Sequence, residues 1–171
     1  MSPSARPRFT RKPAVEIDIV RESPLWENQP CSEEMIRRAI AEASNVSGGG
    51  GELAIVLSDD SRIRSLNRVW RGIDKPTNVL SFPSSQHGKR MPGGGMLGDI
   101  VIAYETTARE AAAQQLPFLH HLAHLAVHGF LHLQGHDHET EDDAEKMECR
   151  ERAILARLDI ADPYAARDSA R

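Results

Sequence analysis

Three histidines and one glycine in the second half of the chain restrict its fold more than any other feature. They lie in residues 128–138, which read HGFLHLQGHDH. Residues four positions apart in an α-helix share one face, about one turn apart, so His128 and His132 can reach one cation. Gly135 can adopt the left-handed conformation that ends a helix, which lets His138 turn back toward that cation. The spacing predicts a helix, a turn and a three-histidine metal site.

The number of ligands indicates what this metal site does. Three protein ligands leave a fourth coordination position for water, which is typical of catalytic zinc sites. We therefore expect one zinc ion, although three histidines also accept nickel or copper. The full HxxxHxxGxxH spacing matches the ligand set of the metzincin proteases. Their motif has a glutamate directly after the first histidine as general base, and this chain has Gly129 there. Its absence counts against peptide cleavage and favours substrates such as phosphodiesters, whose developing negative charge an arginine can stabilise.

The rest of the chain predicts a single α+β domain with a small sheet of about four strands. Strands are expected at 15–20, 53–57, 79–82 and 99–103, and helices from Ser32, from about Asp59, over 104–116, over 117–133 and after Thr140. We expect a flexible segment at 1–13, the domain at 14–160 and a frayed tail at 161–171. In the second helix, the pattern predicts a buried stripe of Ile63, Leu66, Val69 and Trp70.

Charge is segregated along the sequence, and this matters more than the net charge of -4. Five cations lie within fourteen residues (Arg62, Arg64, Arg68, Arg71 and Lys75), whereas acidic residues gather at 137–151. The basic stretch is consistent with a nucleic-acid contact, and equally with a solvated helix face. No stretch reads as a membrane span or a secretory signal, so we expect a cytoplasmic protein without a membrane partner.

Three blocks of sequence resemble one known family. Residues 128–138, residues 66–83 (LNRVWRGIDKPTNVLSFP) and residues 97–100 (LGDI) are similar in order and spacing to the YbeY endoribonucleases. The similarity covers about residues 15–158. Two positions depart from the family pattern, because Asn78 stands where aspartate is common and His136 where tyrosine is common.

The resemblance implies a function for the whole chain. It implies a single-domain α+β endoribonuclease that matures the 3′ end of the 16S-type small-subunit ribosomal RNA and takes part in ribosome quality control. It implies that His128, His132 and His138 bind zinc and that Arg71 is the catalytic arginine. The expected partners are ribosomal RNA and the small ribosomal subunit, and no DNA. A single-stranded substrate is favoured, because side chains cannot read the narrow major groove of an RNA duplex.

Several residues near the motif have two interpretations. Arg71 could instead form a surface ion pair with Asp74, worth about 0–1 kcal/mol. Asp137 and Glu139 could orient the ligand imidazoles or could be solvated loop charges. Two more histidines continue the row of four-residue steps toward the N-terminus; we expect both to rotate away from the metal, with His124 the more suitable to support a ligand.

Two other functions remain open at this point. A metzincin-like metalloprotease would explain the ligand spacing. It would need another carboxylate near the metal-bound water as general base, because position 129 is a glycine. A non-catalytic ribosome assembly factor would use the metal for stability. Removal of the metal would then unfold the domain. The pattern does not fix the oligomeric state.

Overall fold

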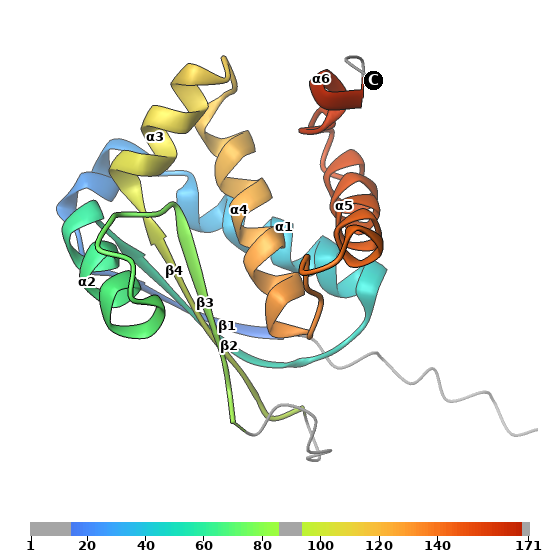
Figure 1. Cartoon of the computed structure of the whole chain (residues 1–171), viewed down its shortest axis with the longest axis horizontal. Coiled ribbons are helices and arrows are strands. Elements are labelled where there is room, and N and C mark those ends of the chain that lie inside the picture. Colours follow the sequence, from blue (N-terminus) through green and yellow to red (C-terminus); the bar gives the residue numbers. More distant parts are fainter. Residues whose placement is uncertain (1–14, 86–93, 169–171) are drawn as a thin grey trace, which may run out of the picture.

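The fold is built around a mixed sheet of four strands (Figure 1). The computed structural model describes residues 15–85 and 94–168. Across the sheet the strands follow the order β1 (Val15–Arg21), β2 (Gly51–Ser58), β4 (Met96–Ala103) and β3 (Val79–Pro83). The first three are parallel, and β3 pairs antiparallel with β4 at the edge. The predicted α+β domain with a four-stranded sheet is confirmed.

Helices cover the two faces of the sheet unequally. They are η1 (Pro24–Asn28), α1 (Ser32–Ser47), α2 (Asp60–Arg71), α3 (Tyr104–Ala113), α4 (Phe118–Leu133), α5 (Glu141–Ala156) and α6 (Ala165–Asp168). Helices α1, α4 and α5 lie on one side of the sheet and α2 lies on the other (Figure 1). None of the helices within the described ranges is both long and apolar enough to cross a membrane.

The main core lies between the sheet and helices α1 and α4. Alternate residues of β2, namely Leu53, Ile55 and Leu57, are buried and belong to this core, as the period of two in a strand requires. Helix α4 contributes more buried side chains than its neighbours, because its apolar residues occupy most of its circumference. Burial on most sides fixes α4 in position, and with it the histidines that it carries.

The second face of the sheet has a smaller core under α2. Ile63 is fully buried there and Leu66 is partly buried, but Val69 is 72% exposed and Trp70 69% exposed. The predicted four-residue stripe is therefore wrong in its second half. The reason is that the small core ends at Leu66, and Trp70 lies at its margin against the Phe82 ring, edge-on, with 5.6 Å between ring centroids.

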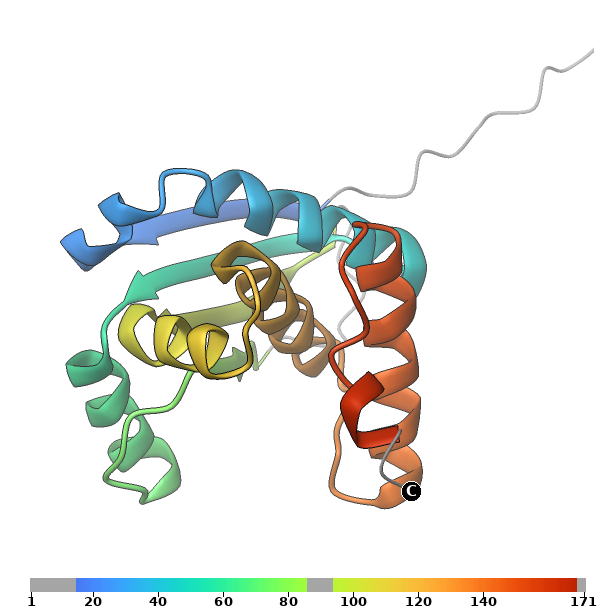
Figure 2. The ribbon, with the colours of Figure 1, turned by 90° about the horizontal axis from the view of Figure 1, so that it is seen from above.

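Residues 162–168, which belong to the tail expected to fray, lie beside helix α5. Figure 2 shows α6 beside α5. The Tyr164 hydroxyl donates a hydrogen bond to Glu151 of α5, and the Arg152 guanidinium lies 3.2 Å from an oxygen of Asp162. The Tyr164 ring also contacts the His124 ring and the Arg152 guanidinium, so both ends of this amphipathic side chain have partners on the domain. The segment expected to be flexible at 1–13 lies outside the described residues.

Candidate metal centre

The end of α4 positions the histidine cluster as the spacing predicts. His128 and His132 lie one turn apart in the last part of the helix. Gly135 has φ of +87°, and the amide of His136 donates to the carbonyl of Leu131 at 3.0 Å. This left-handed residue reverses the chain, so that His138 faces the helix it has just left.

The three imidazoles converge on one point. The Nε2 atoms of His128 and His132 are 3.0 Å apart, and one ring nitrogen from each of the three histidines lies within 4.8 Å of the others. Among residues 15–85 and 94–168, these histidines are the set of histidine, cysteine or acidic side chains that could hold a metal ion. The donor set fits a borderline cation, because three neutral nitrogens suit zinc, nickel or copper.

The cluster also favours the form of histidine that binds metals. Burial, together with charge repulsion from the neighbouring His128 and His138 rings, lowers the pKa of His132 to about 4. A neutral imidazole presents a free lone pair, whereas a protonated one cannot coordinate. His132 is therefore ready to coordinate at neutral pH without first losing a proton.

A buried carboxylate from α5 supports the cluster. Glu151 is 1% exposed, and its Oε1 lies 2.6 Å from Nδ1 of His128. Burial alone would raise the pKa of Glu151, but hydrogen bonds from His124 and His128 outweigh it and lower the pKa to about 2. The ionised carboxylate accepts a hydrogen bond from Nδ1–H of His128, which leaves Nε2 of that ring directed toward the other two rings.

Glu151 is not among the residues predicted from the sequence. The sequence indicates Asp137 and Glu139 as acids that could orient the ligand rings, but Asp137 accepts a hydrogen bond from the backbone amide of His138 at 2.7 Å. The available signal was an acidic residue inside an apolar stripe, because Glu151 lies between Met147 and Ile154 on the buried face of α5. His124 does lie behind the cluster, 3.6 Å from Glu151, as expected.

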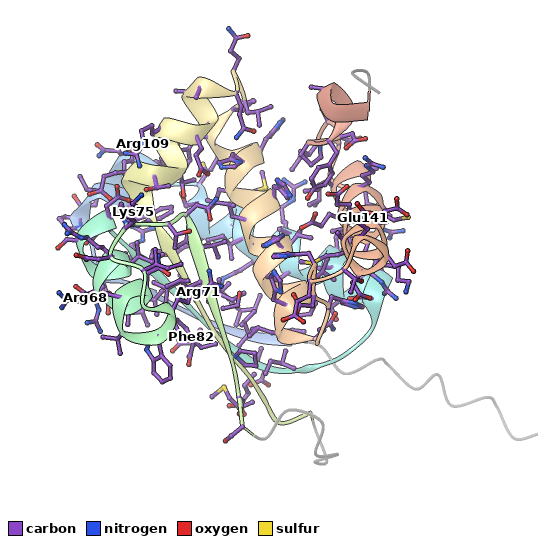
Figure 3. All side chains as sticks on the ribbon, in the orientation of Figure 1. Arg68, Arg71, Lys75, Phe82, Arg109 and Glu141 are labelled. Carbon is purple, nitrogen blue, oxygen red and sulfur yellow. The ribbon has the colours of Figure 1, made fainter. Side chains whose placement is uncertain are left out.

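The cluster opens into a polar hollow that also contains Arg71. This hollow has a volume of about 350 Å³ and lies between the end of α4, the end of α2 and strand β3, with Asn78 and Ser81 in its wall. Asp74 is paired with Arg64 at 2.8 Å, so the alternative pairing with Arg71 is wrong. Arg71 makes no hydrogen bond or ion pair with any residue of the described ranges. Figure 3 shows Arg71 between α2 and β3, whereas Arg68 lies on the outer side of α2.

Close packing explains the glycine that replaces the protease glutamate. A Cβ atom at Gly129 would lie 3.1 Å from two side-chain carbons of Ile100 and from Oγ of Ser81. The Ser81 hydroxyl donates to the carbonyl of Gly129 at 3.2 Å. Helix α4 approaches the sheet so closely here that a side chain at position 129 would require Ile100 or Ser81 to shift.

Comparison with known proteins assigns the family. A family model described as Endoribonuclease YbeY matches residues 25–159. The chain belongs to the YbeY family. A YbeY endoribonuclease of Rhodopseudomonas palustris is 54% identical, with 98% of this chain and 86% of that protein covered. The protein of the same name from Bradyrhizobium diazoefficiens is also 54% identical, covering 91% of this chain and 87% of its own length.

The YbeY match includes the whole metal-binding cluster and Arg71, but ends before Tyr164. A solution structure of a Thermotoga maritima protein aligns with 86% of this chain at 25% identity and a TM-score of 0.47. The family is one of metal-dependent endoribonucleases. The predicted membership of the YbeY family is therefore confirmed.

Proposed function

We propose that this chain is a zinc-dependent endoribonuclease that cleaves single-stranded RNA, with the 3′ end of small-subunit ribosomal RNA as its substrate. The observation that carries the proposal is the position of Arg71, which lines the same hollow as three convergent imidazoles and forms no ion pair with any residue that the structure describes. We extend it to a cytoplasmic role in ribosome quality control, in association with the small ribosomal subunit, as the family resemblance implies.

The residues of the hollow suit a phosphodiester substrate. A zinc ion held by His128, His132 and His138 would supply Lewis acidity toward a phosphoryl oxygen. Arg71 donates hydrogen bonds in a planar fork that matches two phosphate oxygens, and these bonds strengthen as charge develops on them. Glu151 holds the His128 ring in one orientation, so the ligand geometry is fixed before substrate arrives.

The hollow also supports a preference for single strands. Its catalytic groups come from the ends of two helices and the turn that follows α4, and they line a recess of about 350 Å³ beside an edge strand. A backbone that can bend into this recess reaches them more readily than a stiff duplex.

The competing functions have specific weaknesses. A metzincin-like protease needs a carboxylate beside the cluster, and the packing of Gly129 against Ile100 leaves no space for one at the usual position. A non-catalytic assembly factor gives no reason for an unpaired arginine next to a metal site with an open coordination position.

The direct test is cleavage of a labelled RNA fragment from the 3′ end of small-subunit ribosomal RNA. We expect His132→Ala to be inactive and Arg71→Ala to be about 100- to 1000-fold slower, since one transition-state donor is worth this much. Arg68→Ala is the matched control, because it removes an exposed arginine of the same helix that does not line the hollow, and should cleave like the parent protein.

Folding of each variant is checked by circular dichroism, and zinc content by metal analysis. Equal cleavage by all four proteins would mean a contaminating nuclease, and the assembly-factor function would then be preferred. Cleavage lost in His132→Ala but kept in Arg71→Ala would remove the arginine from the mechanism.

A further inference from the structure

Strand β3 separates the metal hollow from a second, larger hollow. Successive side chains of a strand point to opposite faces. Accordingly Ser81 lines the metal hollow, while Phe82 lines the second one. The end of α2 divides in the same way, because Arg71 lines the metal hollow and Trp70, its neighbour in sequence, lines the second. The two hollows thus lie on opposite faces of the sheet and meet at its edge strand β3, where Pro83 lines both.

The second hollow has an aromatic and aliphatic lining. Its volume is about 620 Å³, and its wall includes Trp70, Phe82, Leu66 and Met96. Trp70 is 69% exposed and Met96 43% exposed, so this apolar surface is open to solvent. Large apolar side chains gathered at the surface mark binding sites, whereas scattered ones need no explanation.

The charges in the second hollow differ from those in the metal hollow. Asp99 and Glu22 contribute carboxylates, and Arg62 lies 3.9 Å from Glu22. Two carboxylates disfavour a phosphate group, but a carboxylate accepts hydrogen bonds from the amino groups of nucleobases. An aromatic surface with hydrogen-bond acceptors therefore suits a base, while the unpaired Arg71 next to it suits the phosphate of the same strand.

From this arrangement we propose that the second hollow binds an unstacked nucleobase of single-stranded RNA, which stacks on Trp70 while the strand passes over β3 to the metal hollow. The proposal rests on the proposed function, because it names the class of substrate that the metal centre receives. Base stacking on aromatic side chains tolerates different sequences and is a common way to hold single strands. Both hollows would then act on one RNA strand.

The two tryptophans allow a direct binding test. The chain contains Trp26 and Trp70 only. Trp26 is fully buried, so quenching of tryptophan emission by a ligand reports on Trp70. The measurement uses the His132→Ala protein without metal, which cannot cleave, titrated with a short single-stranded oligoribonucleotide. We expect quenching on binding, and a loss of this signal in the additional variant Trp70→Phe with most of the affinity kept.

Affinity measured by anisotropy of labelled RNA gives the size of the effect. Trp70→Ala should raise the Kd for single-stranded RNA by about 5- to 150-fold, the equivalent of one stacked base. Val69→Ala is the matched control, since it truncates a neighbouring residue that is 72% exposed and does not line the hollow. Inorganic polyphosphate should not quench Trp70.

Three results would overturn the proposal. Unchanged affinity in Trp70→Ala would show that no base stacks there. Equal quenching by polyphosphate would show a phosphate site. Emission that depends on protein concentration and not on RNA would identify the face as an interface between copies of the chain. Quenching by RNA without any cleavage by the parent protein would instead leave the base site standing and refute the proposed ribonuclease activity.

Discussion

The two halves of helix α4 carry the same residue type and use it differently. In the first half, His121 is 5% exposed and its Nε2 lies 2.8 Å from Oε2 of Glu110 on α3. In the second half, His128 and His132 point their Nε2 atoms at each other across 3.0 Å. The first arrangement pairs His121 with an acid of another helix, whereas the second brings two imidazoles together, one of which, His128, also contacts Glu151 through its other nitrogen. Whether a histidine of this helix forms an ion pair or joins the metal cluster therefore depends on the residues that pack against its turn.

The difference has a stability consequence as well as a chemical one. A histidine paired with a carboxylate stabilises the metal-free fold, because each group compensates for the desolvation of the other. Convergent imidazoles do not stabilise the metal-free fold in this way and become favourable only around a cation. Variants in the first half should thus change stability, and variants in the second half should change metal affinity.

The largest expected effect comes from His132→Ala. We expect metal affinity, measured by competition with a chelator, to fall by more than the roughly 100-fold that supporting residues are worth, because a ligand itself is lost. His121→Gln is the comparison in the first half of α4, and should keep its metal affinity while its Tm falls. If both variants lost metal equally, the division of α4 into two functional halves would be wrong.

Glu151→Gln should have the next largest effect. The change keeps the shape of the side chain but removes the negative charge that His128 contacts. We expect metal affinity to fall about 10- to 100-fold, as for other acids that support ligand imidazoles. Glu145→Gln, an exposed position of the same helix, is the control and should leave affinity unchanged. Unchanged affinity in Glu151→Gln would mean that this acid serves only to hold α5 against α4.

The Glu110 pair predicts a pH effect confined to the first half of α4. Burial raises the pKa of Glu110, but hydrogen bonds from His121 and Asn78 outweigh it, so the pKa lies below its ordinary value. The lowered pKa stabilises the fold above about pH 4.3, the ordinary glutamate value, and this stability is lost as pH falls through the lower folded value.

A thermal-unfolding series tests this pH effect. At neutral pH Glu110→Gln should lower Tm by a few degrees, about what the loss of charged hydrogen bonds costs a chain of this size. The difference from the parent protein should shrink below about pH 4.3. A difference that stays constant with pH would assign the loss to altered packing and not to charge.

Tyr164→Phe should have the smallest effect. The change removes only the hydroxyl that donates to Glu151 and keeps the ring, which lies 5.7 Å from the His124 ring. We expect a loss of stability of about 1 kcal/mol, typical of one hydrogen bond, and a change in metal affinity smaller than that of Glu151→Gln. A larger loss of metal affinity than in Glu151→Gln would mean that the C-terminal segment, and not the carboxylate, positions His128.

Local features of this chain could be predicted from sequence and long-range ones could not. The placement of His128, His132, Gly135 and His138 follows from the geometry of one helix and one turn, so the convergence of the three rings could be predicted. The strands could be predicted by alternation, but their order depends on crossovers that no local pattern encodes. Glu151 reaches the cluster from another helix, so spacing gives no clue to its partner.

The prediction for the exposed end of α2 is wrong for a related reason. Apolar periodicity predicts which residues share a face, but not how far the facing surface extends. Val69 and Trp70 continue the stripe of Ile63 and Leu66, yet the core beneath them has already ended. Where an apolar stripe of a helix continues beyond the core that it covers, its last residues form an exposed apolar surface that is available for binding.

The tight contact at Gly129 also constrains how this centre can change over evolution. Introducing a glutamate there would have to displace Ile100 or Ser81, since a Cβ atom alone already comes within 3.1 Å of both. A peptidase-like catalytic base at this position would therefore overpack the core unless Ile100 or Ser81 gave way. The three-histidine site of this chain and that of the metzincins share a spacing, but the packing around Gly129 opposes the single substitution that would give this chain the metzincin glutamate.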